Sequence, residues 1–402
     1  MQKSAKDAKI GKRCKCCLGA TVKPNPFTPT FGKVPPYLAG REEIIDEMAQ
    51  AFTNGPGDPN LSTIIVGARG TGKTALLTCI ANEAASLGWI TASVSAAPGM
   101  LDDILQRAKE AAEEYVSDAE KVSIREIGIP QILSVRLERS SEEKPNWRTK
   151  MNRLFKEFEP LGIGLLITVD EVTVKLDEMV QLASVYQHFV RENKRVALIM
   201  AGLPYQVSEL VNDSRVSFLR RARRQTLGRL PDAEIENALL ATVEDAGKRI
   251  GEAALLEAVS AIDGFPYMMQ LVGYRSWAAS RSEEITVSDV KRGAKQAADE
   301  FRLGVIETTF RELSPMDIRF CEAMAEHKGS SRLSDVAAHM GVSDSIPRNG
   351  RLLDGVMEML LQGLLCGYEI EAFNKDEVIY IIGRGGLAIT CCQELIQAHL
   401  YK

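Results

Sequence analysis

Several features that define whole classes of protein are missing from this sequence of 402 residues. No uninterrupted apolar run reaches the ~20 residues needed to cross a bilayer, and the basic N-terminus lacks the apolar core of a secretory signal. The eight cysteines are scattered and do not resemble a disulfide framework. The net charge of −5 gives no general attraction to nucleic acid, so any such contact must be local. We therefore expect a soluble, cytoplasmic protein with reduced thiols.

Histidine is also scarce, with four in the chain, and this bears on the cluster Cys14, Cys16 and Cys17. A structural zinc ion needs four ligands, but no second ligand pair is near and the next histidine is His188. Reduced cysteines that bind no metal are therefore favoured over a zinc site. Residues 1–24 carry seven lysines and arginines against a single acid, Asp7. We expect residues 1–30 to be a disordered basic tail, either solvated or in contact with nucleic acid.

What the sequence does contain is the phosphate-binding pattern G-x-x-x-x-G-K-[ST], between an apolar β-branched run and a helical run that begins at Ala75. Its residues are Gly67, Ala68, Arg69, Gly70, Thr71, Gly72, Lys73 and Thr74. Glycines let the loop backbone curl so that its N–H groups face phosphates, and the helix N-terminus adds partial positive charge. Lys73 is expected to reach the β- and γ-phosphates and Thr74 to ligate Mg²⁺. We predict that residues 67–75 bind a nucleoside triphosphate.

A second motif follows the continuous apolar run 163–169, which is typical of a strand buried on both faces. The run ends at Asp170 and Glu171, where the carboxyl end of a parallel strand places a ligand site. After a P-loop, Asp170 suits the shell of a Mg²⁺ ion and Glu171 suits deprotonation of an attacking water. The pair predicts ATPase chemistry.

The wider pattern predicts an α/β domain over residues 31–230. Apolar strands at 62–66, 89–94, 163–169 and 196–202 alternate with helices, which indicates a parallel sheet with helices on both faces. Residues 119–145 fit neither element and are interpreted as an insertion or surface hairpin. Residues 231–305 are expected to form a wholly helical lid, with helices near 233–249, 252–262, 266–281 and 287–303. Residues 306–402 are expected to form a winged helix-turn-helix, with strands at 364–366 and 378–382.

With these motifs in this order, residues 35–400 resemble the AAA+ ATPases. The nearest group is the origin-recognition-like ATP-binding domains, which also resemble the STAND NTPases. Leu38-Ala39-Gly40-Arg41-Glu42 is similar to the family's entry motif, which implies that Pro36, Tyr37 and Arg41 lie near adenine. Residues 218–222 resemble the arginine-finger segment, so Arg220 and Arg221 are candidates to reach a neighbour's γ-phosphate in a homo-oligomer. Gly264-Phe265-Pro266 is similar to the sensor-2 motif.

Two departures from the family pattern concern residues that sense the γ-phosphate. Tyr267 follows Pro266 where many relatives carry an arginine, and Ala201-Gly202 stands where relatives carry a polar residue. Each departure removes a donor that would stabilise charge developing at the γ-phosphate. The sequence therefore predicts ATP binding with slow or partner-dependent hydrolysis, as in a switch.

Two functions remain open for the C-terminal residues. The first is a DNA-bound switch, with Arg348 and Arg351 and, around the wing, Lys375 and Arg384 as a local basic face. The second is a STAND-like regulator whose C-terminal module contacts protein. Residues 310–402 hold nine Lys/Arg and thirteen Asp/Glu, an acidic balance of four that does not favour DNA.

Overall fold

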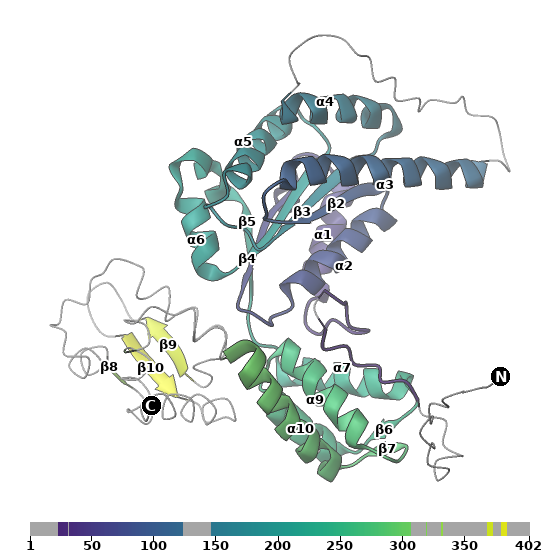
Figure 1. Cartoon of the computed structure of the whole chain (residues 1–402), viewed down its shortest axis with the longest axis vertical. Coiled ribbons are helices and arrows are strands. Elements are labelled where there is room, and N and C mark those ends of the chain that lie inside the picture. The colour runs from purple at the N-terminus through teal and green to yellow at the C-terminus, as the bar shows by residue number, and fades with distance from the viewer. Residues whose placement is uncertain are drawn as a thin grey trace, which may run out of the picture.

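The fold was analysed in a computed structural model of the chain. It describes residues 23–30, 32–123 and 146–306, together with Arg319 and three short strands near the C-terminus. Apart from these strands, the described residues form two lobes, an α/β core and a helical lid (Figure 1). None of its helices is long and apolar enough to span a bilayer.

The core is built on one parallel sheet of five strands in the order β2-β3-β4-β1-β5. The strands are β1 (Ser62–Gly67), β2 (Trp89–Ser95), β3 (Gly164–Asp170), β4 (Val196–Gly202) and β5 (Arg223–Leu227). The parallel sheet predicted from the apolar runs is confirmed. Because β4 lies between β1 and β3, the carboxyl ends of these three strands are neighbours at one edge of the sheet.

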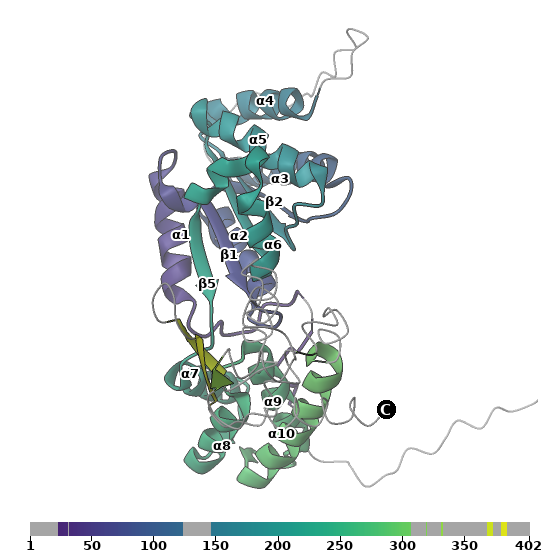
Figure 2. The same ribbon diagram turned by 90° about the vertical axis from the view of Figure 1, so that its left-hand side faces the viewer.

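Helices cover both faces of the sheet, as predicted (Figure 2). On one face lie α1 (Glu42–Asn54) and α2 (Lys73–Ser86). On the other lie α3 (Met100–Ser123), α4 (Trp147–Phe158), α5 (Asp177–Arg191) and α6 (Pro204–Asn212). Short 3₁₀ turns occupy Pro59–Leu61, Glu159–Leu161 and Ser214–Arg221. Of residues 119–145, interpreted from the sequence as an insertion or surface hairpin, residues 119–123 instead continue α3, and residues 124–145 lie outside the described residues.

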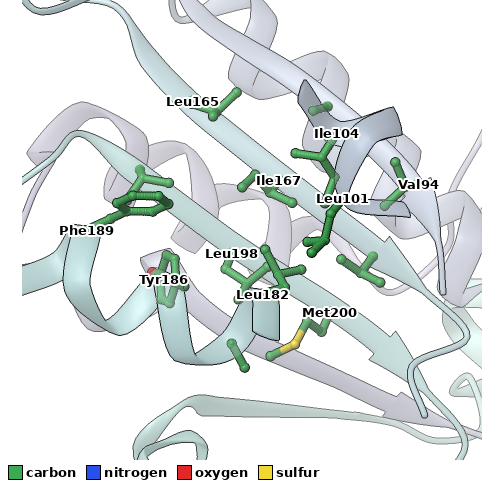
Figure 3. Close-up of a cluster of buried hydrophobic side chains, with 14 of the residues drawn as sticks. Val94, Leu101, Ile104, Leu165, Ile167, Leu182, Tyr186, Phe189, Leu198 and Met200 are labelled. Atoms are coloured by element: carbon green, nitrogen blue, oxygen red, sulfur yellow. The ribbon is translucent and has the colours of Figure 1, made fainter. Parts of the chain in front are cut away.

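Alternation along the strands divides the apolar side chains between two cores. On β1, Ile64 packs with the α3–α6 side and Ile65 with the α1–α2 side, and both are fully buried. Figure 3 shows the larger cluster, where Leu165, Ile167, Leu198 and Met200 of β3 and β4 meet side chains of α3 and α5. This burial fixes the central strands, and with them the positions of the loops that follow.

Two elements of the core were not predicted from the sequence. Pro204 begins α6, and the arginine-rich segment after it continues into β5, which pairs in parallel with β1. Strand β5 lies at the edge of the sheet, and its first two residues, Arg223 and Arg224, are exposed. Charged side chains on an edge strand oppose pairing with another chain, which explains why this strand lacks an apolar pattern.

The lid consists of α7 (Asp232–Asp245), α8 (Glu252–Ile262), α9 (Pro266–Ala279) and α10 (Val287–Phe301), followed by a π-helical turn at Arg302–Ile306. The prediction of a wholly helical lid is wrong at two places, because β6 (Arg249–Ile250) and β7 (Glu284–Ile285) form a small parallel sheet. The first helix was predicted to reach residue 249 but ends at Asp245. Gly247 has φ +80°, and the Lys248 N–H turns back to the carbonyl of Val243 at 3.0 Å.

Beyond the lid, three strands form an antiparallel sheet in the order β8-β10-β9. They are β8 (Ser331–Arg332), β9 (Tyr368–Ala372) and β10 (Ile379–Gly383). The strand predicted at 378–382 therefore corresponds to β10. The helices of the predicted winged helix-turn-helix and the strand predicted at 364–366 lie outside the described residues, apart from Arg319.

Candidate nucleotide site

The loop between β1 and α2 has a backbone that only glycine adopts readily at two positions. Gly70 has φ +79° and Gly72 has φ +86°, both in the left-handed region. Thr71 is 3% exposed, and its hydroxyl donates to the carbonyl of Ala68 at 2.9 Å. A Cβ atom at Gly67 would lie 2.6 Å from the Thr71 hydroxyl oxygen. The loop is therefore curled and internally braced before α2, whose N-terminus suits an anion.

Lys73 and Thr74 open α2 and point to different parts of this site. The Lys73 ammonium donates to the carbonyls of Gly67 and Ala68, both at 2.7 Å, so it lies over the loop. The Thr74 hydroxyl donates to Asp170 Oδ2 at 2.5 Å. The structure thus brings together the two residues predicted to serve Mg²⁺, although they lie on separate motifs. Of the other predicted contacts, Arg69 is half-buried within the loop and Ala75 is half-buried in the first turn of α2.

Asp170 is the last residue of β3, and Glu171 follows with φ +57°, which is unusual for a residue other than glycine. The Glu171 N–H donates to Asp170 Oδ1 at 2.9 Å, and the Asp170 carbonyl accepts from the Ala96 N–H at 2.9 Å. These bonds hold the turn after β3 beside the end of β2. The exposed Glu171 side chain is consequently carried at the same sheet edge as the loop.

The donor set fits a magnesium ion. A hydroxyl and a carboxylate are hard oxygen ligands, and Mg²⁺ keeps waters and phosphate oxygens for its other positions. No group of three or more His, Cys, Asp or Glu side chains that could hold a metal occurs in the residues that the structure describes. An ion held by Thr74 and Asp170 would depend on the phosphates of a nucleotide.

The end of β4, between the P-loop strand and β3, is crowded by the turn that follows β3. The Val172 N–H donates to the Ala201 carbonyl at 3.0 Å, which draws the turn after β3 across this position. A Cβ atom at Gly202 would lie 2.7 Å from Val172 Cγ2. A larger residue at Gly202 would therefore displace the Val172 side chain, a contact that sequence reasoning did not find.

The N-terminus of α9 meets the P-loop directly. Pro266 occupies its first turn, and the Tyr267 N–H donates to the Gly70 carbonyl at 3.2 Å. The Tyr267 ring lies 6.2 Å from the Phe301 ring, and burial, with the nearby charge of Glu300, raises the pKa of its phenol. The motif compared with sensor 2 is thus placed against the phosphate-binding loop.

The residues expected near adenine lie on two sides of the link between core and lid. Arg41 is 9% exposed and donates to the Gly228 carbonyl at 3.2 Å, just after β5, and burial lowers its pKa. Tyr37 donates its hydroxyl to Asp245 at the end of α7, and this hydrogen bond raises the pKa of the phenol. Tyr37 is therefore joined to the lid, whereas Arg41 is held next to β5.

The two arginine-finger candidates differ in their surroundings. Arg220 is engaged within the chain, since its Nε donates to the Val211 carbonyl at 3.1 Å at the end of α6. Arg221 is exposed, and within the described ranges no hydrogen bond or ion pair is found for its guanidinium. Of the other arginines in this segment, Arg215 pairs with Asp213 at 2.9 Å and Arg229 with Asp263 at 2.8 Å. Arg221 is thus the candidate better exposed to a neighbouring molecule.

A parallel sheet with the P-loop after β1, an acidic pair after β3 and a helical lid that meets the loop defines the AAA+ P-loop fold. The chain is similar to the Walker-type ATPase PABY2304 of Pyrococcus abyssi, with a TM-score of 0.59 and 16% identity over 90% of this chain and 96% of that one. It is also similar to the ORC2 protein of Aeropyrum pernix, solved as ADPNP–ADP complexes, with a TM-score of 0.57 and 13% identity over 93% and 98%.

No protein-family model and no curated protein sequence matches the chain. At identities of 16% and 13% the likeness concerns the fold, which is that of the origin-recognition-like AAA+ proteins.

Proposed function

We propose that this protein binds ATP with Mg²⁺ and acts as a slowly hydrolysing switch that couples its nucleotide state to assembly on DNA. The observation that carries the proposal is the contact between lid and loop, where the Tyr267 N–H donates to the Gly70 carbonyl. A phosphate bound at Gly70 would change the surroundings of the lid helix in the same place. Nucleotide state and lid position are therefore coupled through one backbone hydrogen bond.

The chemistry that these residues supply follows from their positions. The loop N–H groups and Lys73 bind phosphate oxygens, and Thr74 and Asp170 hold Mg²⁺, which neutralises charge on the phosphates when bound. Glu171 takes a proton from the attacking water. Arg221, or Arg220 once released from α6, would reach a γ-phosphate bound to a second copy, so that turnover depends on a homo-oligomer.

Slow hydrolysis is supported by the two sensor positions. The end of β4 carries Gly202, next to Val172, and α9 carries Tyr267. Neither residue has a cationic or amide side chain that could contact the γ-phosphate. Donors placed at developing charge contribute several kcal/mol to catalysis, about 10²–10³ in rate for each one removed. ATP consequently stays bound for longer than it would in a site that carries both sensor residues.

Tyr267→Arg tests this point. Arginine at this position adds a cation beside Gly70, and we expect steady-state ATP hydrolysis to rise by about tenfold or more. Tyr267→Phe is the matched control, because it keeps the ring near Phe301 and removes the hydroxyl, and it should leave turnover within about twofold of the parent. An unchanged rate for Tyr267→Arg, in protein that still binds ATP, would show that this position does not limit hydrolysis.

A STAND-like regulator is the second candidate, favoured by the acidic balance of residues 310–402, with nine Lys/Arg against thirteen Asp/Glu. One experiment separates the two functions: ATPase activity with and without duplex DNA, beside the mass in solution with ATP or ADP. A DNA-bound switch should assemble with ATP and bind DNA in a salt-dependent way that Arg348→Ala/Arg351→Ala abolishes. Assembly with ATP but no effect of DNA would favour the regulator, with protein as the partner. A monomer that ignores ATP would contradict both.

DNA binding that survives Arg348→Ala/Arg351→Ala and depends on residues 1–22 would assign the contact to the basic N-terminal tail. In that case the C-terminal module has no part in holding DNA, and the switch would act through the N-terminus.

A further inference from the structure

Residues 23–30, which the sequence placed in a disordered tail, pack on the lid in the structure. Phe27 is 2% exposed and belongs to the apolar core of the lid. Its ring lies on α9 at Gly273, where a Cβ atom would be 2.3 Å from Phe27 Cε1. Any larger residue at position 273 would therefore displace the ring. We call residues 23–30 the strap.

Polar contacts fix the strap on α9 at neighbouring positions. Asn25 Nδ2 donates to the Tyr274 carbonyl at 3.0 Å, and the Thr28 N–H donates to Gln270 Oε1 at 3.0 Å. Gln270 is 8% exposed, so this amide is held inside the protein. With Phe27 over Gly273, the strap contacts two successive turns of α9 and has a defined register on it.

The same helix begins at the P-loop. Tyr267, one turn before Gln270, donates its N–H to the Gly70 carbonyl, and a Cβ atom at Gly70 would lie 3.1 Å from Tyr267 Cβ. Because an α-helix moves as a rigid unit over so short a distance, a shift of residues 270–274 also shifts residue 267.

The chain after the strap returns to the core at the link between the two lobes. A Cβ atom at Gly40 would lie 3.1 Å from Leu230 Cδ2, and Arg41 Nη2 donates to the Gly228 carbonyl. The described residues 23–30 and 32–41 thus lie between α9 and the segment that joins β5 to the lid, along the dark purple trace in Figure 1. This part of the chain therefore leads from α9 to α1 of the core.

We propose that the strap is a positioning element that holds α9 against the P-loop and thereby slows nucleotide release, with Phe27 as its anchor. This inference rests on the proposed nucleotide binding. Phe27 acts through α9 and does not touch the nucleotide, so its loss changes retention of ATP and not the chemical step.

The test is the rate at which a fluorescent ATP analogue (mant-ATP with Mg²⁺) leaves the full-length protein when chased with excess ATP. We expect Phe27→Ala to accelerate release by about five- to tenfold, the size of a modest coupling between two sites. Phe27→Leu, which keeps apolar bulk over Gly273, should restore most of the slow release. The single-turnover hydrolysis rate at saturating ATP should stay at the wild-type value in both variants.

Phe158→Ala is the matched control, because Phe158 is 4% exposed and lies in the core between the sheet and α4, away from the strap. It should leave the release rate unchanged. If Phe27→Ala fails to fold, Asn25→Ala removes two strap hydrogen bonds, one to the Tyr274 carbonyl and one from the Phe27 N–H, without opening a cavity. Release should still quicken by about two- to threefold.

Wild-type release rates in folded Phe27→Ala, or in folded Asn25→Ala where Phe27→Ala does not fold, would overturn the inference, as would equal acceleration by Phe158→Ala. A wild-type protein that binds no mant-ATP would instead contradict the proposed function itself, so the two failures are distinguishable.

Discussion

Lys73→Ala is expected to abolish measurable ATP binding while the protein stays folded. The ammonium lies 2.7 Å from the carbonyls of Gly67 and Ala68, over the loop where phosphates would be cradled. Two charge-assisted hydrogen bonds to phosphate contribute about 3–6 kcal/mol, so affinity should fall by about 10²–10⁴. Titration calorimetry with a non-hydrolysable ATP analogue measures the loss directly.

Lys156→Ala provides a matched control for this substitution. Lys156 is exposed in the last turn of α4, so its truncation removes the same charge from the surface at a distance from the loop. Both variants should keep the far-ultraviolet circular dichroism of the parent. Folded Lys73→Ala that bound ATP within threefold of the parent would refute the assignment of residues 67–74 as the phosphate-binding loop.

The parts of the site that sequence predicted are those encoded locally. The positive φ angle at Gly72 needs glycine, and the eight-residue motif fixes glycine at this position, whereas Gly70, also at positive φ, stands at a variable position of the motif. The buried strands are predicted by continuous apolar runs such as 163–169, since a strand covered on both faces leaves little choice of side chain. Because parallel strands end at one edge, the placement of Asp170 near the P-loop followed from the strand pattern.

The parts that sequence missed depend on distant neighbours. Strand β5 is polar and exposed, and its partner β1 lies about 160 residues earlier in the chain, so no local pattern marks it. Packing of Phe27 against Gly273 joins segments still further apart. The crowding of Gly202 by Val172 also requires the three-dimensional turn after β3. An isolated aromatic in a proline-rich segment was the available signal for the strap.

Glu171→Gln is expected to retain ATP binding and lose turnover by about 10²–10⁴. The amide has nearly the size of the carboxylate but cannot accept a proton from water. Glu171 occupies a left-handed backbone position with φ +57°, and glutamine must adopt the same conformation. The wild-type protein and Glu171→Gln therefore differ in the chemistry of this side chain and hardly in backbone strain. A change in turnover can then be assigned to the lost carboxylate.

Phosphate release under multiple-turnover conditions measures the loss, and mant-ATP affinity shows whether binding persists. Asp170→Asn is the informative companion, because it removes the carboxylate that accepts from Thr74 at 2.5 Å and should weaken Mg²⁺-dependent binding as well as turnover. Hydrolysis by Glu171→Gln at the parent rate would mean that another group activates the water. If turnover is lost, the variant stays in its ATP-bound state. Its mass in solution with ATP should then equal that of the wild-type protein before it hydrolyses ATP.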